Sequence, residues 1–341
     1  MKKIVLTGGG TGGHVIPLLS LVPSLRKVYD EIHFFGRREG IERDLCKNEE
    51  VVYHGIDCAK FIRGKIFANL KLPFALYKSV KEAKTLIEEI KPCVIFSKGG
   101  FASLPASLGK GKVPLVIHES DRSYGLANRL VKGRADMVLS AFPLKGARLV
   151  GSPIRQSVYS GNRERARVEF GFTRPLPTLL ITGGSMGAEA INKVVDEGRE
   201  ELTKRFNIIH LCGKGNGNTT EEGYARREFL TNMEDALALC DYALSRGGAN
   251  TLFELVALAI PSLVVPLPKG ASRGDQIENA NYFASRSAIE ILPQSELTVA
   301  NLMIRLQNLR TRAVVLKKNM RDFPHLDGRD EICKILSSYA K

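Results

Sequence analysis

The sequence predicts a doubly wound α/β fold built as two similar halves, and two observations carry this prediction. Short apolar runs alternate with helix-like stretches along the chain, as in parallel strands joined by helices. One motif also occurs twice: the runs 4–9 (IVLTGG) and 179–184 (LLITGG) each pass through glycines into a helix-like stretch. Such a turn brings backbone amides and the positive end of a helix dipole to an anionic group. Two such units at half-chain spacing predict two Rossmann-like domains that face each other across a cleft.

The expected strands are apolar on successive residues, which is typical of parallel strands buried on both faces. Nine such runs stand out, at 4–7, 32–35, 93–97, 114–118, 137–140, 178–182, 207–212, 241–244 and 262–266.

The domain boundaries follow from the segments between these runs. The segment 151–153 (GSP) and the charged stretch 161–167 form the expected linker, and 329–341 is helix-like. We therefore expect two domains with a returning C-terminal helix, over 1–156, 157–324 and 325–341, the last packing on the first domain.

Composition narrows the class of protein. The 341 residues suffice for two domains, and 44% hydrophobic with 25% charged residues is ordinary for a chain with a real core. The six cysteines form no C-x-x-C pair, which argues against a disulfide framework or a zinc site, and we expect no metal. The apolar run after Met1 ends at Thr7, and no run approaches 18 apolar residues. We expect a cytoplasmic protein without a signal peptide or a membrane span.

The net charge of +14 calls for an explanation. Nucleic acid, anionic lipid or a phosphorylated substrate would each account for it, and so would a basic surface with no partner. The chain lacks Trp, contains only 7% aromatic residues and shows no nucleic-acid-binding motif. We therefore expect no nucleic-acid partner.

The first glycine segment, 8–14 (GGGTGGH), contains the G-x-G-x-x-G pattern of dinucleotide-binding folds. That fingerprint also needs a carboxylate at the end of the second strand, but here the strand is followed by Arg37 and Arg38, with Glu39 as the first acid. An NADP site that uses Arg37 stays open. His14 is either a titratable group of the site or a helix-terminal histidine that satisfies a backbone group.

Two further polar segments follow strands of the first half, KGGF at 98–101 and HESD at 118–121. Because the carboxyl ends of parallel strands meet at one edge of a sheet, we expect both segments to converge with His14. His118 and Glu119 have an alternative interpretation as a buried structural pair.

The second half offers three matching segments. In 182–188, Ser185 and backbone amides are suited to an anion, and 245–251 is another turn that opens a helix. There Glu254 either holds a ribose diol or is a plain acid of the first helical turns. The segment 272–279 is either a set of polar contacts for a sugar or a charged loop that begins a helix.

Together these segments resemble the MurG-type peptidoglycan glycosyltransferases. The resemblance covers nearly the whole chain in order: GGGTGGH at 8–14, GGF at 99–101, HESD at 118–121, GSPIR at 151–155, GGSMGA at 183–188 with Asn192, SRGGANTLFE at 245–254 and SRGDQIENA at 272–280. It implies a GT-B fold and an inverting transfer of N-acetylglucosamine from UDP-GlcNAc to the C4 hydroxyl of the MurNAc of lipid I. The product would be lipid II, which serves peptidoglycan synthesis and thereby cell shape and division.

The resemblance also implies roles for single residues. His14 is the expected catalytic base, with Glu119 and Asp121 as rivals. No cofactor is expected beyond the donor substrate. The acceptor diphosphate would meet Thr11, Gly12, Gly13 and His14, and the donor would meet Arg155, Ser185, Asn192, Leu230 (through its backbone), Ala249, Asn250, Glu254 and Gln276.

The segment 60–91 offers an explanation for part of the net positive charge. It holds eight basic against three acidic residues, interleaved with Phe, Ile and Leu. It would dock the protein peripherally on the anionic, cytoplasmic face of the cell membrane, where further cell-wall synthesis proteins are expected partners. The alternative is an ordinary helix whose apolar face is core, with Pro73 dividing the segment.

Three rival functions remain open on the sequence. The first is another GT-B enzyme, such as a lipid galactosyltransferase or a sugar-nucleotide epimerase. The second is an NADP-dependent oxidoreductase built on 8–14, which leaves the second glycine unit and Glu254 unexplained. The third is a sensor that binds UDP-GlcNAc without transferring it.

Overall fold

The computed structural model describes residues 1–10, 12–58, 72–184, 188–270 and 273–340. The chain divides into two compact units, one formed by Met1–Arg155 with Asp327–Lys341 and the other by Gln156–Leu326. The divisions therefore follow residues 155 and 326, where the sequence analysis placed them after 156 and 324.

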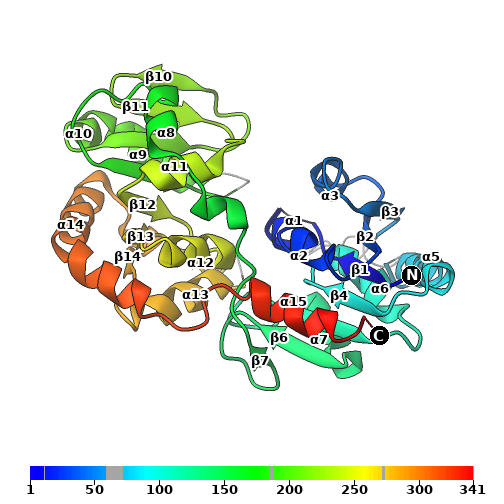
Figure 1. Cartoon of the computed structure of the whole chain (residues 1–341). Coiled ribbons are helices and arrows are strands. Elements are labelled where there is room, and N and C mark those ends of the chain that lie inside the picture. The colour runs from blue at the N-terminus through cyan, green and yellow to red at the C-terminus, as the bar shows by residue number, and fades with distance from the viewer. Residues whose placement is uncertain (11, 59–71, 185–187, 271–272, 341) are drawn as a thin grey trace. The chain divides into compact units, whose positions relative to one another are not determined.

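The first unit is built on a seven-stranded parallel sheet with the order β3-β2-β1-β4-β5-β6-β7 (Figure 1). All five strands expected in this half are confirmed, whereas β3 and β7 were not predicted. The strands are β1 (Lys3–Thr7), β2 (Glu31–Arg37), β3 (Val52–Ile56), β4 (Val94–Ser97), β5 (Leu115–Glu119), β6 (Met137–Ser140) and β7 (Arg148–Leu149).

Helices cover both faces of this sheet, which explains why its strands are apolar on successive residues. In β1, Ile4 and Leu6 enter one core and Val5 enters the core on the opposite face. The first core includes residues of α1 (Gly12–Leu19), α2 (Val22–Leu25) and α15 (Arg329–Ser337). The second includes residues of α5 (Leu72–Ile90), α6 (Leu104–Leu108) and α7 (Leu126–Val131).

The last helix returns to the first unit. In Figure 1, α15 (red) lies with the blue and cyan elements, although it is last in the chain. Its Leu336 is fully buried, and the Leu336 carbonyl accepts a 2.6 Å hydrogen bond from Tyr29 Oη. The Gly328 amide, just before the helix, donates to the Ser152 carbonyl at 2.8 Å. The helix ends at Ser337, earlier than the expected stretch to 341.

The second unit repeats the design with a sheet of order β10-β11-β9-β8-β12-β13-β14. Its strands pair in parallel except β10 with β11. The four expected strands are confirmed, and the short strands β10, β11 and β14 were not predicted. The strands are β8 (Thr178–Thr182), β9 (Asn207–Leu211), β10 (Thr219–Glu221), β11 (Tyr224–Arg227), β12 (Tyr242–Ser245), β13 (Ser262–Val264) and β14 (Glu290–Ile291).

The charged stretch 161–167 is not a linker throughout, because α8 begins at Arg163. Asn162 caps this helix by accepting a 2.8 Å hydrogen bond from the Arg165 amide. The charges misled the prediction since they lie on the exposed side of a short helix. The unit's described helices are α8 (Arg163–Glu169), α9 (Glu189–Glu197), α10 (Arg199–Thr203), α11 (Met233–Leu239), α12 (Ala249–Ala257), α13 (Asp275–Ala284) and α14 (Val299–Arg321).

Candidate active site

The first glycine loop is organised around a buried carboxylate that sequence reasoning did not single out. Glu42, on α3 (Ile41–Leu45), is fully buried, and its Oε1 accepts a 2.6 Å hydrogen bond from the Gly10 amide. A Cβ atom on Gly9 would lie 2.0 Å from the same oxygen. Gly9 is therefore needed to accommodate Glu42. A carboxylate shortly after the second strand, in the first turn of a helix, was the available signal.

This arrangement weakens the oxidoreductase alternative. The guanidinium of Arg37, the residue proposed for an NADP phosphate, lies with its Nε 3.6 Å from Glu42 Oε1. The Gly10 amide, which a dinucleotide pyrophosphate would use, already donates to Glu42. The Gly10 amide and the Arg37 guanidinium are thus both directed toward Glu42.

The second glycine loop lies against the first, as the sequence analysis expected from neighbouring strands. Strands β1 and β4 pair in parallel, so both loops leave the carboxyl edge of the sheet. Gly100 has φ +81°, and a Cβ there would lie 2.2 Å from the Gly9 carbonyl oxygen. Only glycine permits this approach of two backbones.

The loop after β5 joins this edge and is held by Glu119. This carboxylate is buried and accepts three hydrogen bonds, from the Asp121 amide (3.1 Å), the Gly125 amide (2.9 Å) and Asn128 Nδ2 (2.9 Å). Asn128 Nδ2 also donates to the His118 carbonyl at 3.1 Å. Glu119 therefore fixes the course of the loop that carries Asp121, whatever its part in proton transfer.

Of the residues expected to meet the acceptor, Gly12, Gly13 and His14 lie at the same edge. Gly12 and His14 are the first and third residues of α1, and His14 is half-buried. The His14 carbonyl lies 3.3 Å from where a Cβ on Gly8 would stand, so the helix begins directly on the glycine loop. Gly13 is exposed beside it, and Thr11 lies outside the described residues. Their catalytic and binding roles remain predictions.

In the second unit, Asn192 belongs to a buried network. Its Nδ2 donates to the Cys212 carbonyl at 2.9 Å, and its Oδ1 lies 3.0 Å from His210 Nε2. His210 Nδ1 lies 2.8 Å from Tyr224 Oη. Because an amide oxygen only accepts, His210 carries its proton on Nε2 and accepts from the tyrosine through Nδ1. Burial lowers the pKa of His210 to about 4, so it is neutral. The expected donor contact of Asn192 remains a prediction.

The turn before α12 has the form expected for a phosphate site. Gly248 is the N-cap, and the amides of Ala249 and Asn250 belong to the first helical turn. Glu254 follows in the same helix and is half-buried. This turn leaves the carboxyl end of β12, which pairs in parallel with β8, so it shares a sheet edge with the turn after Thr182.

Gln276, expected to contact the sugar, also holds this turn. Its Oε1 accepts hydrogen bonds from the Gly247 amide (3.2 Å) and the Leu267 amide (3.1 Å). Asn279 Nδ2, one turn later, donates to the Gly247 carbonyl at 3.3 Å. The start of α13 thus supports the glycine turn before α12. The role of Gln276 toward a sugar remains a prediction.

Arg246 belongs to the SRGGANTLFE segment at 245–254, but sequence patterns indicated no role for it. Its side chain is buried, and Nη1 donates to the Val265 carbonyl at 3.0 Å. Burial lowers its pKa. A buried cation directly before Gly247 adds positive charge next to the α12 turn, where the donor phosphates are expected.

For the remaining residues expected to bind the donor, the structure gives position and burial only. Leu230 is buried between β11 and α11, and Arg155 is half-buried at the end of the first unit's main segment. Ser185 lies outside the described residues. In the described part of the chain, no group of three His, Cys, Asp or Glu side chains could hold a metal ion.

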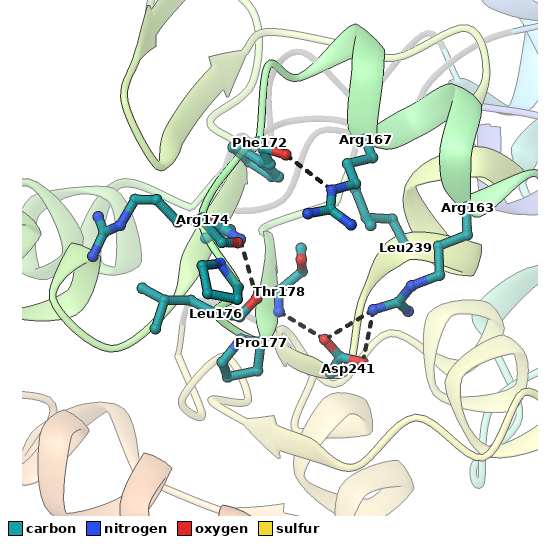
Figure 2. Close-up of a pocket in the computed structure, with 11 residues that line it drawn as sticks. Arg163, Arg167, Phe172, Arg174, Leu176, Pro177, Thr178, Leu239 and Asp241 are labelled. Atoms are coloured by element: carbon teal, nitrogen blue, oxygen red, sulfur yellow. Dashed lines mark hydrogen bonds and ion pairs between the residues drawn. The ribbon is translucent and has the colours of Figure 1, made fainter.

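A pocket of about 300 Å³ lies at the other edge of the second sheet, where its strands begin. Figure 2 shows Arg163 reaching Asp241 and Arg167 reaching the Phe172 carbonyl. Arg163 Nη2 lies 3.2 Å from Asp241 Oδ1, and Asp241 Oδ2 accepts from the Thr178 amide at 2.8 Å. These groups join α8 to the sheet. The pocket is therefore structural, and the glycine turns at the opposite edge are the candidate site.

Two α/β units, each with glycine turns at the carboxyl edge of its sheet, have the architecture of the GT-B class, to which many glycosyltransferases belong. Residues 4–140 match the glycosyltransferase family 28 N-terminal domain, and residues 178–332 match the glycosyltransferase family 28 C-terminal domain. The chain belongs to glycosyltransferase family 28.

Curated relatives agree over the full length. The chain is 40% identical to the UDP-N-acetylglucosamine–N-acetylmuramyl-(pentapeptide) pyrophosphoryl-undecaprenol N-acetylglucosamine transferase of Clostridium tetani (strain Massachusetts / E88), covering 99% of this chain and 98% of that protein. It is also 40% identical to the transferase of the same name from Clostridium botulinum (strain Kyoto / Type A2), covering 100% of both. The crystal structure of MurG from Acinetobacter baumannii has the same fold, with TM-score 0.76, 23% identity, and 99% of this chain and 100% of that chain covered.

Proposed function

We propose that this protein transfers N-acetylglucosamine from UDP-GlcNAc to the C4 hydroxyl of the MurNAc of lipid I, the undecaprenyl-diphosphate-linked MurNAc-peptide. The observation that carries this is the pair of glycine-turn edges, one on each sheet, in a chain 40% identical over its whole length to transferases of that name. The product is lipid II, a precursor for peptidoglycan.

The proposed reaction is a direct displacement with inversion. The acceptor oxygen forms a bond to the anomeric carbon while the bond from that carbon to the UDP oxygen breaks. Negative charge grows on the leaving diphosphate, and the first-turn amides of α12 are suited to stabilise it. Buried Arg246 next to that turn adds positive charge.

A general base takes the proton of the attacking hydroxyl, and we assign this role to His14. It stands at the start of α1, directly on the first glycine loop. Glu119 already accepts three hydrogen bonds, two from the loop that follows it and one from Asn128 on α7, which supports a structural role for that carboxylate. Asp121, on the same loop, is the remaining rival.

We also propose that the first unit docks on the anionic, cytoplasmic face of the cell membrane. On α5, Phe74 and Tyr77 are 76% and 68% exposed, and Lys78 and Lys81 are exposed beside them. Aromatic and basic side chains on one helix face suit the interface of an anionic bilayer. The opposite side of α5 packs into the core, as the ordinary-helix alternative required.

The docking surface expected from the sequence also includes the segment that precedes α5. The segment 59–71, with the other basic and aromatic residues of the expected surface, lies outside the described residues. Pro73 is the second residue of α5 as described, a first-turn position where proline is tolerated. In the described residues, no helix is long and apolar enough to span a bilayer.

The experiment is product analysis by mass spectrometry, with NMR spectroscopy of the sugar nucleotide because epimerisation of the donor leaves its mass unchanged. The protein is incubated with UDP-GlcNAc and a short-chain lipid I analogue, with UDP-galactose and a diacylglycerol acceptor as matched alternatives. We expect one N-acetylhexosamine to be added to the lipid I analogue only. Transfer only to the diacylglycerol, or epimerisation of the donor, would contradict the proposal in favour of another GT-B enzyme.

A further inference from the structure

Lys98 is a fully buried lysine at the carboxyl edge of the first sheet. It directly follows β4, and its side chain is 1% exposed. Its Nζ lies 3.0 Å from His118 Nδ1 and donates a hydrogen bond to Ser120 Oγ. The ammonium group thus joins the loop after β4, which carries Gly99 and Gly100, to the end of β5 and the loop that follows it.

The hydrogen-bond directions at His118 are fixed by its other nitrogen. His118 Nε2 lies 2.9 Å from the Gly151 carbonyl oxygen, which can only accept. Nε2 therefore carries the proton, and Nδ1 accepts from Lys98. Burial and the neighbouring Lys98 charge hold the pKa of His118 well below its usual value, so the ring is neutral. A chain of hydrogen bonds runs from Lys98 through His118 to Gly151.

The charge on Lys98 is costly to the fold. Burial lowers the pKa of Lys98 from 10.5 to about 7, although the negative charges of Glu119 and Asp121 act in the opposite direction. The described groups that face it are His118 and Glu119 on β5, Ser120 and Asp121 on the following loop, and uncharged Gly8 directly after β1. A packing role would be filled as well by an apolar side chain of similar length, without this cost.

We propose that Lys98 is a positioning residue of the first unit. Its ammonium group ties the second glycine loop to the loop that carries Asp121, and its positive charge holds the acidic residues Glu119 and Asp121 in place. The inference rests on the proposed transfer reaction. It assigns no contact between Lys98 and the substrate, because the Lys98 side chain is only 1% exposed.

The kinetic test uses Lys98→Met and Lys98→Arg in the full-length protein, with UDP-GlcNAc and a short-chain lipid I analogue from pH 6 to 9. We expect Lys98→Met to lower kcat by up to about 100-fold while the KM for UDP-GlcNAc stays unchanged, since a small displacement of positioned groups has effects of this size. The wild type should lose activity as the pH rises through about 7, and Lys98→Met should lack this step. Lys98→Arg, whose charge persists, should move the step to higher pH.

The matched control is Lys110→Met. Lys110 lies in the loop before β5 and pairs with Asp136 at 3.2 Å, so its removal also deletes one lysine from this unit. It should leave kcat and the pH profile unchanged. Wild-type activity with Lys98→Met matching it at every pH would overturn the inference. No transfer by the wild type at any pH would contradict the proposed function instead.

A stability measurement tests the same charge without catalysis. Between pH 7 and about 10 the unfolded chain holds a proton on Lys98 that the folded chain lacks, so wild-type stability gains with rising pH. We expect the free energy of unfolding of Lys98→Met, relative to wild type, to be higher at pH 7 than at pH 10. A lysine with merely structural contacts would give a difference that is the same at both values, which would overturn the charge argument.

Discussion

The Glu42 carboxylate accepts a 2.6 Å hydrogen bond from the Gly10 amide while lying completely buried under the first glycine loop. A loop that sequence patterns associate with nucleotide phosphates is thus shaped by an internal carboxylate. Of the three consecutive glycines at 8–10, this packing explains Gly9, whereas Gly10 has φ +93° and a Cβ there would meet nothing within 4 Å.

This packing predicts the effect of adding one methyl group. In Gly9→Ala the new Cβ would stand 2.0 Å from Glu42 Oε1, so the Glu42 side chain or the loop must move and the hydrogen bond to Gly10 is disturbed. We expect acceptor-dependent turnover to fall by up to about 100-fold with UDP-GlcNAc binding unchanged, because the turns proposed to bind the donor lie in the other unit. Steady-state kinetics and donor titration measure both. Gly133→Ala, where a Cβ meets nothing within 4 Å, is the control.

The assignment of the base predicts different outcomes for the three candidates. His14→Ala should lower kcat by roughly 10²- to 10⁴-fold, the usual contribution of a general base, with donor binding little changed. Asp121→Asn should have a smaller effect. Near-normal turnover in His14→Ala with a large loss in Asp121→Asn would transfer the role to Asp121.

Glu119 is expected to behave as a structural residue. In Glu119→Gln an acceptor oxygen is replaced by an amide NH₂ group. This donor would face the N–H donors of Gly125, Asn128 or Asp121. The variant should lose about 1–3 kcal/mol of unfolding free energy, which urea denaturation of the full chain would measure. A variant of unchanged stability but abolished turnover would instead favour Glu119 as the base.

The buried network of the second unit predicts an acid-sensitive fold. The His210 pKa is about 4 in the folded protein and about 6.5 in the unfolded chain. Between these values the unfolded chain binds the additional proton, so stability is present above pH 6.5 and is lost as the pH falls toward 4. The loss attributable to this ring is roughly 3 kcal/mol.

His210→Gln makes this measurable. The variant should be less stable than the wild type at pH 7, because the hydrogen bonds with Tyr224 and Asn192 change. Its disadvantage should shrink as the pH falls from 6.5 to 4. A constant difference across this range, measured by urea denaturation, would show that His210 is not the titrating group.

Sequence patterns predicted the parts of the fold that have strong hydrophobic signals. All nine expected strands are present because parallel strands buried on both faces are continuously apolar, as Val5 and Ile181 illustrate at 0% exposure. The missed strands lack that signal. Strand β10 is fully exposed, and β7 and β14 have two residues each. The charged helix α8 was taken for linker since its short length gives little periodicity.

The sequence could predict which segments meet at the candidate site, because these segments follow neighbouring parallel strands. The expected convergence of 98–101 and 118–121 followed from parallel strands and is found at Gly100 and Lys98. Side-chain partnerships could not be predicted, because Glu42 with Gly10 and Lys98 with His118 join residues 32 and 20 positions apart. The same holds for Gln276, which supports Gly247 from a different helix.

The central claim, that this protein glycosylates a lipid-diphosphate acceptor, is tested most directly by UDP release. The full-length protein is given UDP-GlcNAc in chelator-treated buffer, with and without a short-chain lipid I analogue. We predict release that depends on the acceptor and saturates with its concentration. Binding of UDP-GlcNAc with no acceptor-dependent release would contradict the claim and leave a sugar-nucleotide sensor as the account of the fold.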